Sequence, residues 1–160
     1  MALVFSRACE YALQAVLFMA RNAGRRPMLL QDISRGLAIP HHFLGKVMQR
    51  LAQAGIVESH KGAKGGFNLK RPATQITLRH IVESVDGVSS LNECLLGFPN
   101  CSDDHPCPAH PQWKNAKKSI LQIFENKTVD ALSRSMDSKL IRRARVTKPV
   151  SRRLSTLLRS

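Results

Sequence analysis

The order of sequence patterns between residues 30 and 71 constrains the fold more than any other feature. Residues 30–38, LQDISRGLA, carry apolar side chains at three- and four-residue spacings and predict a helix of roughly two turns. After a turn of about three residues, Pro40 opens a second helical pattern that ends at Gly55. Residues 56–71 then read as two strands around the tip KGAKGG. Helix, short turn, helix and β-hairpin, in this order, predict a winged helix-turn-helix DNA-binding domain.

The second of these helices carries the side chains that we expect to read DNA. Its apolar residues are expected to face the core: Phe43, Leu44, Val47, Met48 and Leu51. The opposite face then presents side chains toward a DNA groove, namely His41, His42, Gly45, Lys46, Gln49 and Gln53. A merely solvated helix face would show the same pattern, but the hairpin that follows it favours DNA binding.

Phosphate contacts are predicted for the cations of the helix and the wing: Lys46, Arg50, Lys61, Lys64, Lys70 and Arg71. The charge distribution agrees with this prediction. The net charge is +14; residues 21–71 hold 10 Lys and Arg against 2 acids, and residues 139–160 hold 8 against none. Residues 72–138 hold 6 against 8. Two basic segments around a mildly acidic middle indicate a polyanionic partner, double-stranded DNA first and an anionic membrane surface second, although a solubilising surface is the alternative.

We expect a cytoplasmic protein that does not enter a membrane. The N-terminal residues MALVFSRACEYAL lack the basic region, apolar core and cleavage site of a secretory signal. No apolar run approaches about 18 residues, the length that a membrane-spanning helix needs. In this reducing compartment, cysteines are expected to serve in metal, cluster or redox chemistry rather than in structural disulfides.

The remaining patterns predict a mostly α-helical chain with one small β-hairpin. Helices are expected over residues 6–22, behind a Ser6 cap, over 77–87, from Gln112 onward and after Thr128. The helix from Gln112 is long and carries large apolar residues, and so small a chain has little left against which to bury them. We therefore expect this helix to form a homodimer interface. The predicted division is a DNA-binding domain (1–90), a cluster-binding loop (91–111), dimerisation helices (112–138) and a basic C-terminal arm (139–160).

Residues 93–113, ECLLGFPNCSDDHPCPAHPQW, predict a metal or cluster site. Six residues separate Cys94 from Cys101, five separate Cys101 from Cys107, and two separate Cys107 from His110. Structural zinc sites usually contain C-x-x-C pairs, and this segment has none, so zinc is disfavoured. Iron-sulfur clusters are bound mainly by thiolates and tolerate wide loops, so a cluster fits better.

Three thiols leave one ligand position for another donor. The candidates are His110, His105, Cys9 and Glu10. Each has an ordinary alternative: the histidines as loop residues, Cys9 as a small buried side chain, and Glu10 as a solvated or capping acid. A non-thiolate ligand would bind its iron atom more weakly than a thiolate and leave that iron open to oxygen or nitric oxide. Such a site suits a sensor.

Taken together, these features resemble the Rrf2 family of bacterial winged-helix regulators. The resemblance covers roughly residues 4–136. It is carried by EYAL in the first helix, IPHHFLGKVMQRLAQAGIVES, the wing KGAKGGFNLKRP, ITLRHIVESVDG and the three cysteines. The family implies a homodimer, a cluster held by the three cysteines, and DNA binding that changes with the state of the cluster.

The resemblance leaves the cluster type open. The spacing from Cys107 to His110 is similar to that of IscR-like members, in which a histidine completes a [2Fe-2S] site. Glu10 stands where NsrR-like members use a carboxylate of the partner subunit with a [4Fe-4S] cluster, and Cys9 adds a third, less favoured choice. The first cysteine spacing is six where IscR-like chains have five, and Gly45 stands where they have a specificity-setting glutamate.

We therefore predict a dimeric transcriptional repressor that senses iron-sulfur status, redox stress or nitric oxide through a bound cluster. A regulator of the same fold that uses zinc or bare thiols is the first alternative, and an electron-transfer protein is the second. The chain has no Ser/His/Asp arrangement, phosphate-binding glycine loop or paired catalytic carboxylates, so it is not expected to be an enzyme.

Overall fold

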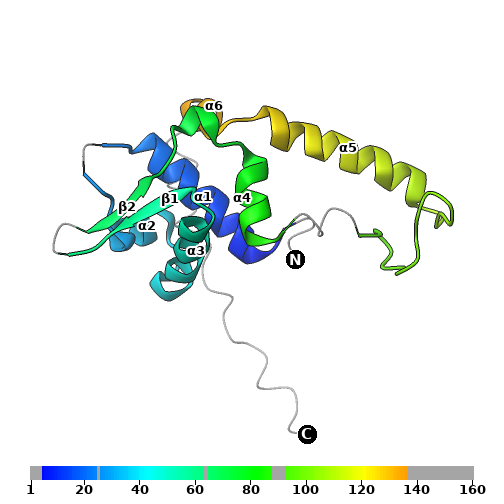
Figure 1. Ribbon diagram of the computed structural model, residues 1–160, viewed down its shortest axis with the longest axis horizontal. Coiled ribbons are helices and arrows are strands. Elements are labelled where there is room, and N and C mark those ends of the chain that lie inside the picture. Colours follow the sequence, from blue (N-terminus) through cyan, green and yellow to red (C-terminus); the bar gives the residue numbers. More distant parts are fainter. Residues whose placement is uncertain (1–4, 25, 63–64, 88–92, 137–160) are drawn as a thin grey trace, which may run out of the picture.

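The computed structural model describes residues 5–24, 26–62, 65–87 and 93–136. Within them the chain is mostly α-helical with one two-stranded sheet, as predicted (Figure 1). The elements are α1 (Arg7–Arg21), α2 (Leu30–Leu37), α3 (His41–Gln53), β1 (Val57–His60), β2 (Gly66–Leu69), the 3-10 turn η1 (Ala73–Gln75), α4 (Leu78–Val85), α5 (His110–Asn126) and α6 (Val129–Ser135). Lys64 and the arm 139–160 lie outside the described residues.

Helix α1 lies at the centre of a body that comprises α1 to α4, the hairpin, η1 and α6. The Ser6 hydroxyl accepts a hydrogen bond from the Cys9 N–H, so the predicted cap of α1 is confirmed. One side of α1 is buried through Ala12, Ala15, Val16 and Met19. The helix contacts α2, α3, α4, α6 and β2. Burial of these apolar faces around one helix supplies the main driving force for folding of the body.

The turn between α2 and α3 is short, as predicted. Ala38 adopts a left-handed conformation (φ 55°) that ends α2, and Pro40 precedes the first residue of α3. The Ser34 hydroxyl donates to the Ile39 carbonyl at 2.6 Å, which ties the turn to α2. A turn of three residues therefore sets the direction in which α3 leaves α2.

The prediction that Phe43 faces the core was wrong. Leu44 and Leu51 are fully buried, but Phe43 is 51% exposed. At about 100° per residue, Leu44, Val47, Met48 and Leu51 form a buried stripe about 100° wide, and Phe43 lies about 40° beyond its Val47 edge. Phe43 instead lines a groove of about 240 Å³ between α1 and α3, together with Arg7 and Tyr11.

The predicted wing is present, and a third segment extends it. Strands β1 and β2 are antiparallel, with Val57 opposite Leu69. On the free edge of β2, Met28 and Phe67 exchange two backbone hydrogen bonds, each 2.9 Å long. Gly66 permits this approach, because it has a positive φ (145°) and a Cβ there would lie 2.7 Å from the Met28 carbonyl oxygen.

Helix α5 extends away from the body and holds the cysteine-rich segment at its far end (Figure 1). The helix starts at His110, two residues before the predicted Gln112. Phe124 is its one buried residue, and its ring meets Phe5 edge-to-face at 5.2 Å. Arg79 of α4 pairs with Glu83 and with Glu125 of α5, both at 2.5 Å. The end of α5 near Phe124 is thus fixed to α4 and to Phe5, which precedes α1.

The last described helix follows its predicted signal. Thr128 caps α6 by accepting a hydrogen bond from the Ala131 N–H at 3.2 Å.

In the part of the chain that the structure describes, no helix has the length and apolar character needed to cross a membrane.

Candidate metal centre and nucleic-acid interface

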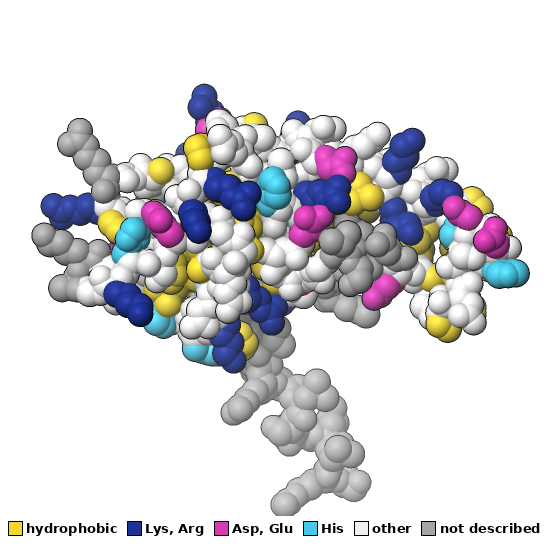
Figure 2. Space-filling view, in the orientation of Figure 1, with side chains coloured by type: hydrophobic (Ala, Val, Ile, Leu, Met, Phe, Trp, Pro, Cys, Tyr) yellow, Lys and Arg dark blue, Asp and Glu magenta, His cyan; other side chains and the backbone are white. Residues whose placement is uncertain are grey.

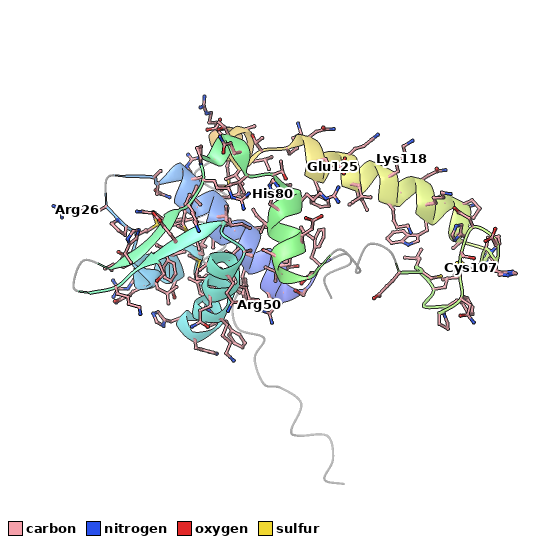
Figure 3. All side chains as sticks on the ribbon, in the orientation of Figure 1. Arg26, Arg50, His80, Cys107, Lys118 and Glu125 are labelled. Atoms are coloured by element: carbon pink, nitrogen blue, oxygen red, sulfur yellow. The ribbon has the colours of Figure 1, made fainter. Side chains whose placement is uncertain are left out.

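The structure brings three thiols together in the cysteine loop, which we define as residues 93–109. The sulfur atoms of Cys94, Cys101 and Cys107 all lie within 4.8 Å of one another. The Cys94 and Cys107 sulfurs lie 3.6 Å apart. All three residues are half-buried, and Cys107 lies at the free end of α5 (Figure 3). Residues that are six to thirteen positions apart in the sequence therefore form one sulfur cluster.

Backbone turns and one indole shape this loop. The Gly97 N–H donates to the Cys94 carbonyl at 3.0 Å, and Gly97 has a positive φ (76°) that favours glycine. The His110 N–H donates to the Cys107 carbonyl at 2.9 Å. The Trp113 indole N–H donates to the Glu93 carbonyl at 2.9 Å, so α5 holds the start of the loop against its own first turns.

His110 lies beside the thiols. Its Nδ1 is 3.1 Å from the Cys101 sulfur, and its side chain is only 16% exposed. Because His110 is the first residue of α5, the helix sets the position of its backbone. Cys101 and His110 are therefore neighbouring donors, while the group of ligand atoms that all lie within 4.8 Å of one another comprises the three sulfurs.

Two of the other predicted fourth ligands, Glu10 and Cys9, lie in α1, and the third, His105, lies in the cysteine loop. Glu10 pairs with Arg7 in α1 at 3.0 Å. Cys9 is fully buried beside Val82 and Phe124, and burial raises the pKa of its thiol to about 12. Cys9 is therefore a core residue. His105 is exposed and lines a hollow of about 330 Å³ that also contacts Cys101 and Cys107.

The thiols of the loop differ in acidity. Partial burial raises the pKa of Cys94, but hydrogen bonds from the backbone N–H groups of Phe98 and Leu96 outweigh it and lower that pKa to about 7. Partial burial and the neighbouring Cys94 raise the pKa of Cys107. The first thiolate is therefore expected at Cys94 near neutral pH.

The donor set fits an iron-sulfur cluster in its chemistry, because thiolates are the usual cluster ligands and imidazole replaces them in some clusters. The sulfur separations also fit a single tetrahedral ion. Zinc–sulfur bonds of about 2.3 Å place tetrahedral sulfurs about 3.8 Å apart. The residues present are thus suited to either kind of inorganic centre.

The predicted DNA-reading side chains that the structure describes are exposed. They are His41, His42, Lys46, Gln49 and Arg50 on α3, Lys61 at the wing tip, and Lys70 and Arg71 after β2. Figure 2 shows Lys and Arg side chains over this half of the molecule and also along the half that contains α5, with acidic side chains among them at the far end. Arg50 is also tied to the body, because its Nη1 donates to the Val85 carbonyl at 3.4 Å.

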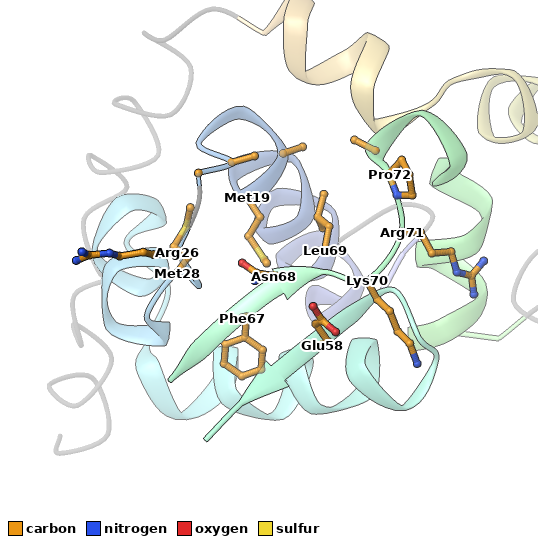
Figure 4. Close-up of a pocket in the computed structure, with 14 residues that line it drawn as sticks. Met19, Arg26, Met28, Glu58, Phe67, Asn68, Leu69, Lys70, Arg71 and Pro72 are labelled. Atoms are coloured by element: carbon orange, nitrogen blue, oxygen red, sulfur yellow. The ribbon is translucent and has the colours of Figure 1, made fainter. Parts of the chain in front are cut away.

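A cleft of about 460 Å³ lies between the end of α1 and the wing (Figure 4). Met19, Met28, Phe67 and Leu69 form its apolar part. Lys70 and Arg71 lie at its rim and extend away from Met19 and Leu69 (Figure 4). The cleft therefore leaves both cations free to reach an external partner.

Sequence reasoning missed two polar residues beside the thiols, Asp103 and Lys114. Asp103 contacts His110 at 2.9 Å and Lys114 at 2.7 Å. Hydrogen bonds from Lys114 and then His110 hold the pKa of the Asp103 carboxyl below its usual value. The four-residue spacing of His110 and Lys114 places them on one helix face, but nothing in the sequence marks Asp103 over its neighbour Asp104.

Solved structures share this architecture. The chain superposes on CymR, the global cysteine regulator of B. subtilis, with a TM-score of 0.70 and 22% identity, covering 83% of this chain and 98% of CymR. IscR of T. potens gives a TM-score of 0.65 and 25% identity, over 84% of this chain and 88% of that structure. The predicted winged-helix fold is therefore confirmed.

Sequence relatives are transcriptional regulators. A protein of Aquifex aeolicus (strain VF5) named as an HTH-type transcriptional regulator is 35% identical over 132 residues, which are 81% of this chain and 91% of that protein. IscR of Pectobacterium carotovorum is 30% identical over 77% of this chain and 74% of its own length. These relatives are not enzymes, in agreement with the prediction for this chain.

The family match spans nearly every described residue. Residues 5–135 match Rrf2, whose description reads "Iron-dependent Transcriptional regulator". This range includes the helix-turn-helix, the wing, the cysteine loop and α5. The chain belongs to the Rrf2 family of transcriptional regulators.

Proposed function

We propose that this transcriptional regulator senses iron-sulfur status, redox stress or nitric oxide through an iron-sulfur cluster in the cysteine loop. The observation that carries the proposal is the convergence of three sulfurs within 4.8 Å, with His110 Nδ1 at 3.1 Å from one of them. The words "iron-dependent" in the family description support it. Three thiols would have little reason to meet in a half-buried loop unless they bind something.

Cys94, Cys101 and Cys107 would hold the cluster, and His110 would be its fourth ligand. A bound cluster supplies an iron core that reacts with oxidants and nitric oxide and that is built only when iron and sulfide are available. Glu10 of a partner subunit is the alternative fourth ligand, since the Glu10 of the same chain is paired with Arg7 in α1.

We propose that the working form is a homodimer formed through α5. Apart from Phe124, no α5 residue is buried within the described chain, and Ile123 is 53% exposed. Apolar side chains on a projecting helix are well suited to pack against a second copy. Two α3 helices related by a twofold axis would then read half-sites about 34 Å apart, or a multiple of that spacing.

On DNA, the exposed cations of α3 and the wing would contact phosphates. Binding to a promoter would compete with RNA polymerase, so we propose repression in the cytoplasm. Each neutralised phosphate contributes about 0.9 to the slope of log K against log salt. A dimer that uses six to eight of these cations should therefore bind about 10⁵- to 10⁷-fold more weakly when salt rises tenfold. Salt-independent binding would contradict this interface.

The decisive experiment is anaerobic purification followed by iron and sulfide analysis, a visible spectrum and promoter binding. We expect iron, acid-labile sulfide and colour in the wild type, their loss in Cys94→Ala, Cys101→Ala and Cys107→Ala, and a change in promoter affinity when they are lost. Equal promoter binding with and without the cluster would refute the sensing proposal.

A structural zinc site is the second candidate, because three thiols at these separations suit one tetrahedral ion, and His110, whose Nδ1 lies 3.1 Å from the Cys101 sulfur, could be the fourth donor. Zinc at one ion per chain without sulfide would establish it. To separate the fourth ligands, Glu10→Gln and His110→Ala should be compared: we expect the His110 variant to lose the cluster and the Glu10 variant to retain it.

A further inference from the structure

We propose that Asp103 and Lys114 are positioning residues that turn the His110 ring so that Nδ1, not Nε2, faces the metal ligands. This inference rests on the proposed role of the cysteine loop in binding an inorganic centre. It assigns a task to two residues that supply no metal ligand themselves.

The two nitrogens of the His110 ring make different contacts. Nδ1 lies 3.1 Å from the Cys101 sulfur, and Nε2 lies 2.9 Å from Asp103 Oδ1. A carboxylate can only accept here, so Nε2 must carry the proton that is shared with Asp103. In a neutral ring, the proton on Nε2 leaves the lone pair on Nδ1, the atom beside the Cys101 sulfur. The Asp103 contact thus selects both the tautomer and the ring orientation that a metal ligand requires.

Lys114 anchors the carboxylate that makes this selection. Its Nζ donates to both oxygens of Asp103 at 2.7 Å. Lys114 lies one helical turn after His110 on α5, so the ring and the cation that holds its partner share one rigid element. Asp103, from the loop between Cys101 and Cys107, is thereby fixed relative to the helix.

The exposure of this pair argues for positioning rather than for stability. The side chains of Asp103 and Lys114 are 68% and 59% exposed. Ion pairs this exposed add little to folding stability. The His110 side chain between them and the thiols is 16% exposed, so its orientation is what their contacts can control.

The chain offers matched controls for both residues. Asp104 carries the same charge on the adjacent loop position, and no side-chain hydrogen bond or ion pair is found for it among the described residues. Lys118 lies one turn beyond Lys114 on α5 (Figure 3) and likewise makes no described ion pair. Asp104→Asn and Lys118→Met therefore repeat the charge changes without touching His110.

The test uses the full chain, purified or reconstituted anaerobically with iron and sulfide. Pulsed EPR of the reduced protein measures coupling of a histidine nitrogen to the iron, and a chelator measures the rate of iron loss. We expect Asp103→Ala to weaken the nitrogen coupling and to speed iron loss about 10- to 100-fold, the usual effect of removing such a partner. Lys114→Met should act in the same direction but less, Asp103→Glu should restore part of the effect, and both controls should match the wild type.

Three results separate this inference from the proposed function. If Asp103→Ala matches Asp104→Asn in both measurements, the positioning role is refuted while the cluster stands. A wild-type cluster without nitrogen coupling would also refute it and would favour Glu10. If the wild type holds zinc instead of a cluster, the cluster proposal fails, and a 10- to 100-fold loss of zinc affinity in Asp103→Ala would still support the positioning role.

Discussion

The body around α1 and the cysteine loop at the end of α5 hold their side chains in place by different interactions. Leu51 in the body is fully buried, whereas Leu96 in the loop is 53% exposed. Around Leu51, shape and apolar burial determine the arrangement. Around Leu96, backbone turns and polar contacts shape the loop that holds the three sulfurs. The comparison suggests that a regulator can keep a rigid DNA-binding unit and a chemically responsive loop in one short chain by separating them.

The largest expected difference concerns the same substitution made in both regions. Leu51→Ala should lower the free energy of unfolding by about 2–5 kcal/mol, because it leaves a cavity in a packed core. Leu96→Ala should change it by less than about 0.5 kcal/mol. Urea denaturation of the metal-free protein, followed by circular dichroism, measures both; equal losses would show that the loop is packed like the body.

The two regions should also differ in thiol reactivity, which can be compared between Cys94 in the loop and Cys9 in the body. At pH 7, about half of Cys94 is thiolate at a pKa of about 7, whereas Cys9, with a pKa of about 12, is almost wholly protonated and buried. We expect iodoacetamide to label Cys94 at least about a hundredfold faster than Cys9 in the reduced, metal-free protein. Labelling of Cys94 should rise with pH through 7 and level off about one to two pH units higher, where the thiol is almost fully ionised. Rapid labelling of folded Cys9, detected by peptide mass spectrometry, would contradict its place in the core.

The proposed dimer predicts an effect confined to α5. Ile123→Glu should raise the dimer dissociation constant about tenfold or more, because it places a charge among apolar side chains at the interface. Gln122→Glu adds the same charge at the neighbouring exposed position and serves as the control. Sedimentation equilibrium measures both, and identical dissociation constants would place the interface elsewhere.

The smallest expected difference concerns a polar contact at the start of α4, within the body. The Thr77 side chain accepts from the His80 N–H and caps α4, while the His80 side chain accepts from the Thr77 N–H. Thr77→Ala should cost about 1 kcal/mol, and Thr77→Ser should restore most of it. A cap substitution that left the unfolding midpoint unchanged would mean that packing alone determines the start of α4.

Most of the body could be predicted from the sequence because its helices bury one face. The spacing of Ala12, Val16 and their neighbours predicted α1, and hydroxyl caps marked the starts of α1 and α6. Phe43 was assigned wrongly because an apolar residue beside a buried stripe was counted as part of it. The early start of α5 was missed because its first turn contains polar residues and Pro111, which give no apolar periodicity.

Contacts between distant segments were harder to predict. The backbone hydrogen bonds between Met28 and Phe67 join two segments that are far apart in the sequence. The residue pattern of neither segment indicates that the other is its partner. In the site, cysteine spacing predicted a thiol cluster, but the choice of Asp103 over Asp104 depends on the path of the loop in three dimensions. The roles of the three cysteines and of His110 as ligands stay predictions.

The length of α5 has a mechanical consequence. Its 17 residues span about 25 Å, of which about 21 Å lie between Phe124, which contacts Phe5, and His110 at the other end. The helix can therefore rotate as a rigid body about the Phe5–Phe124 contact. By this geometry, a tilt of about 5° at this contact would move the far end by about 2 Å. A rearrangement of that size among the sulfurs would, conversely, reach the body as a small rotation next to α1 and α4.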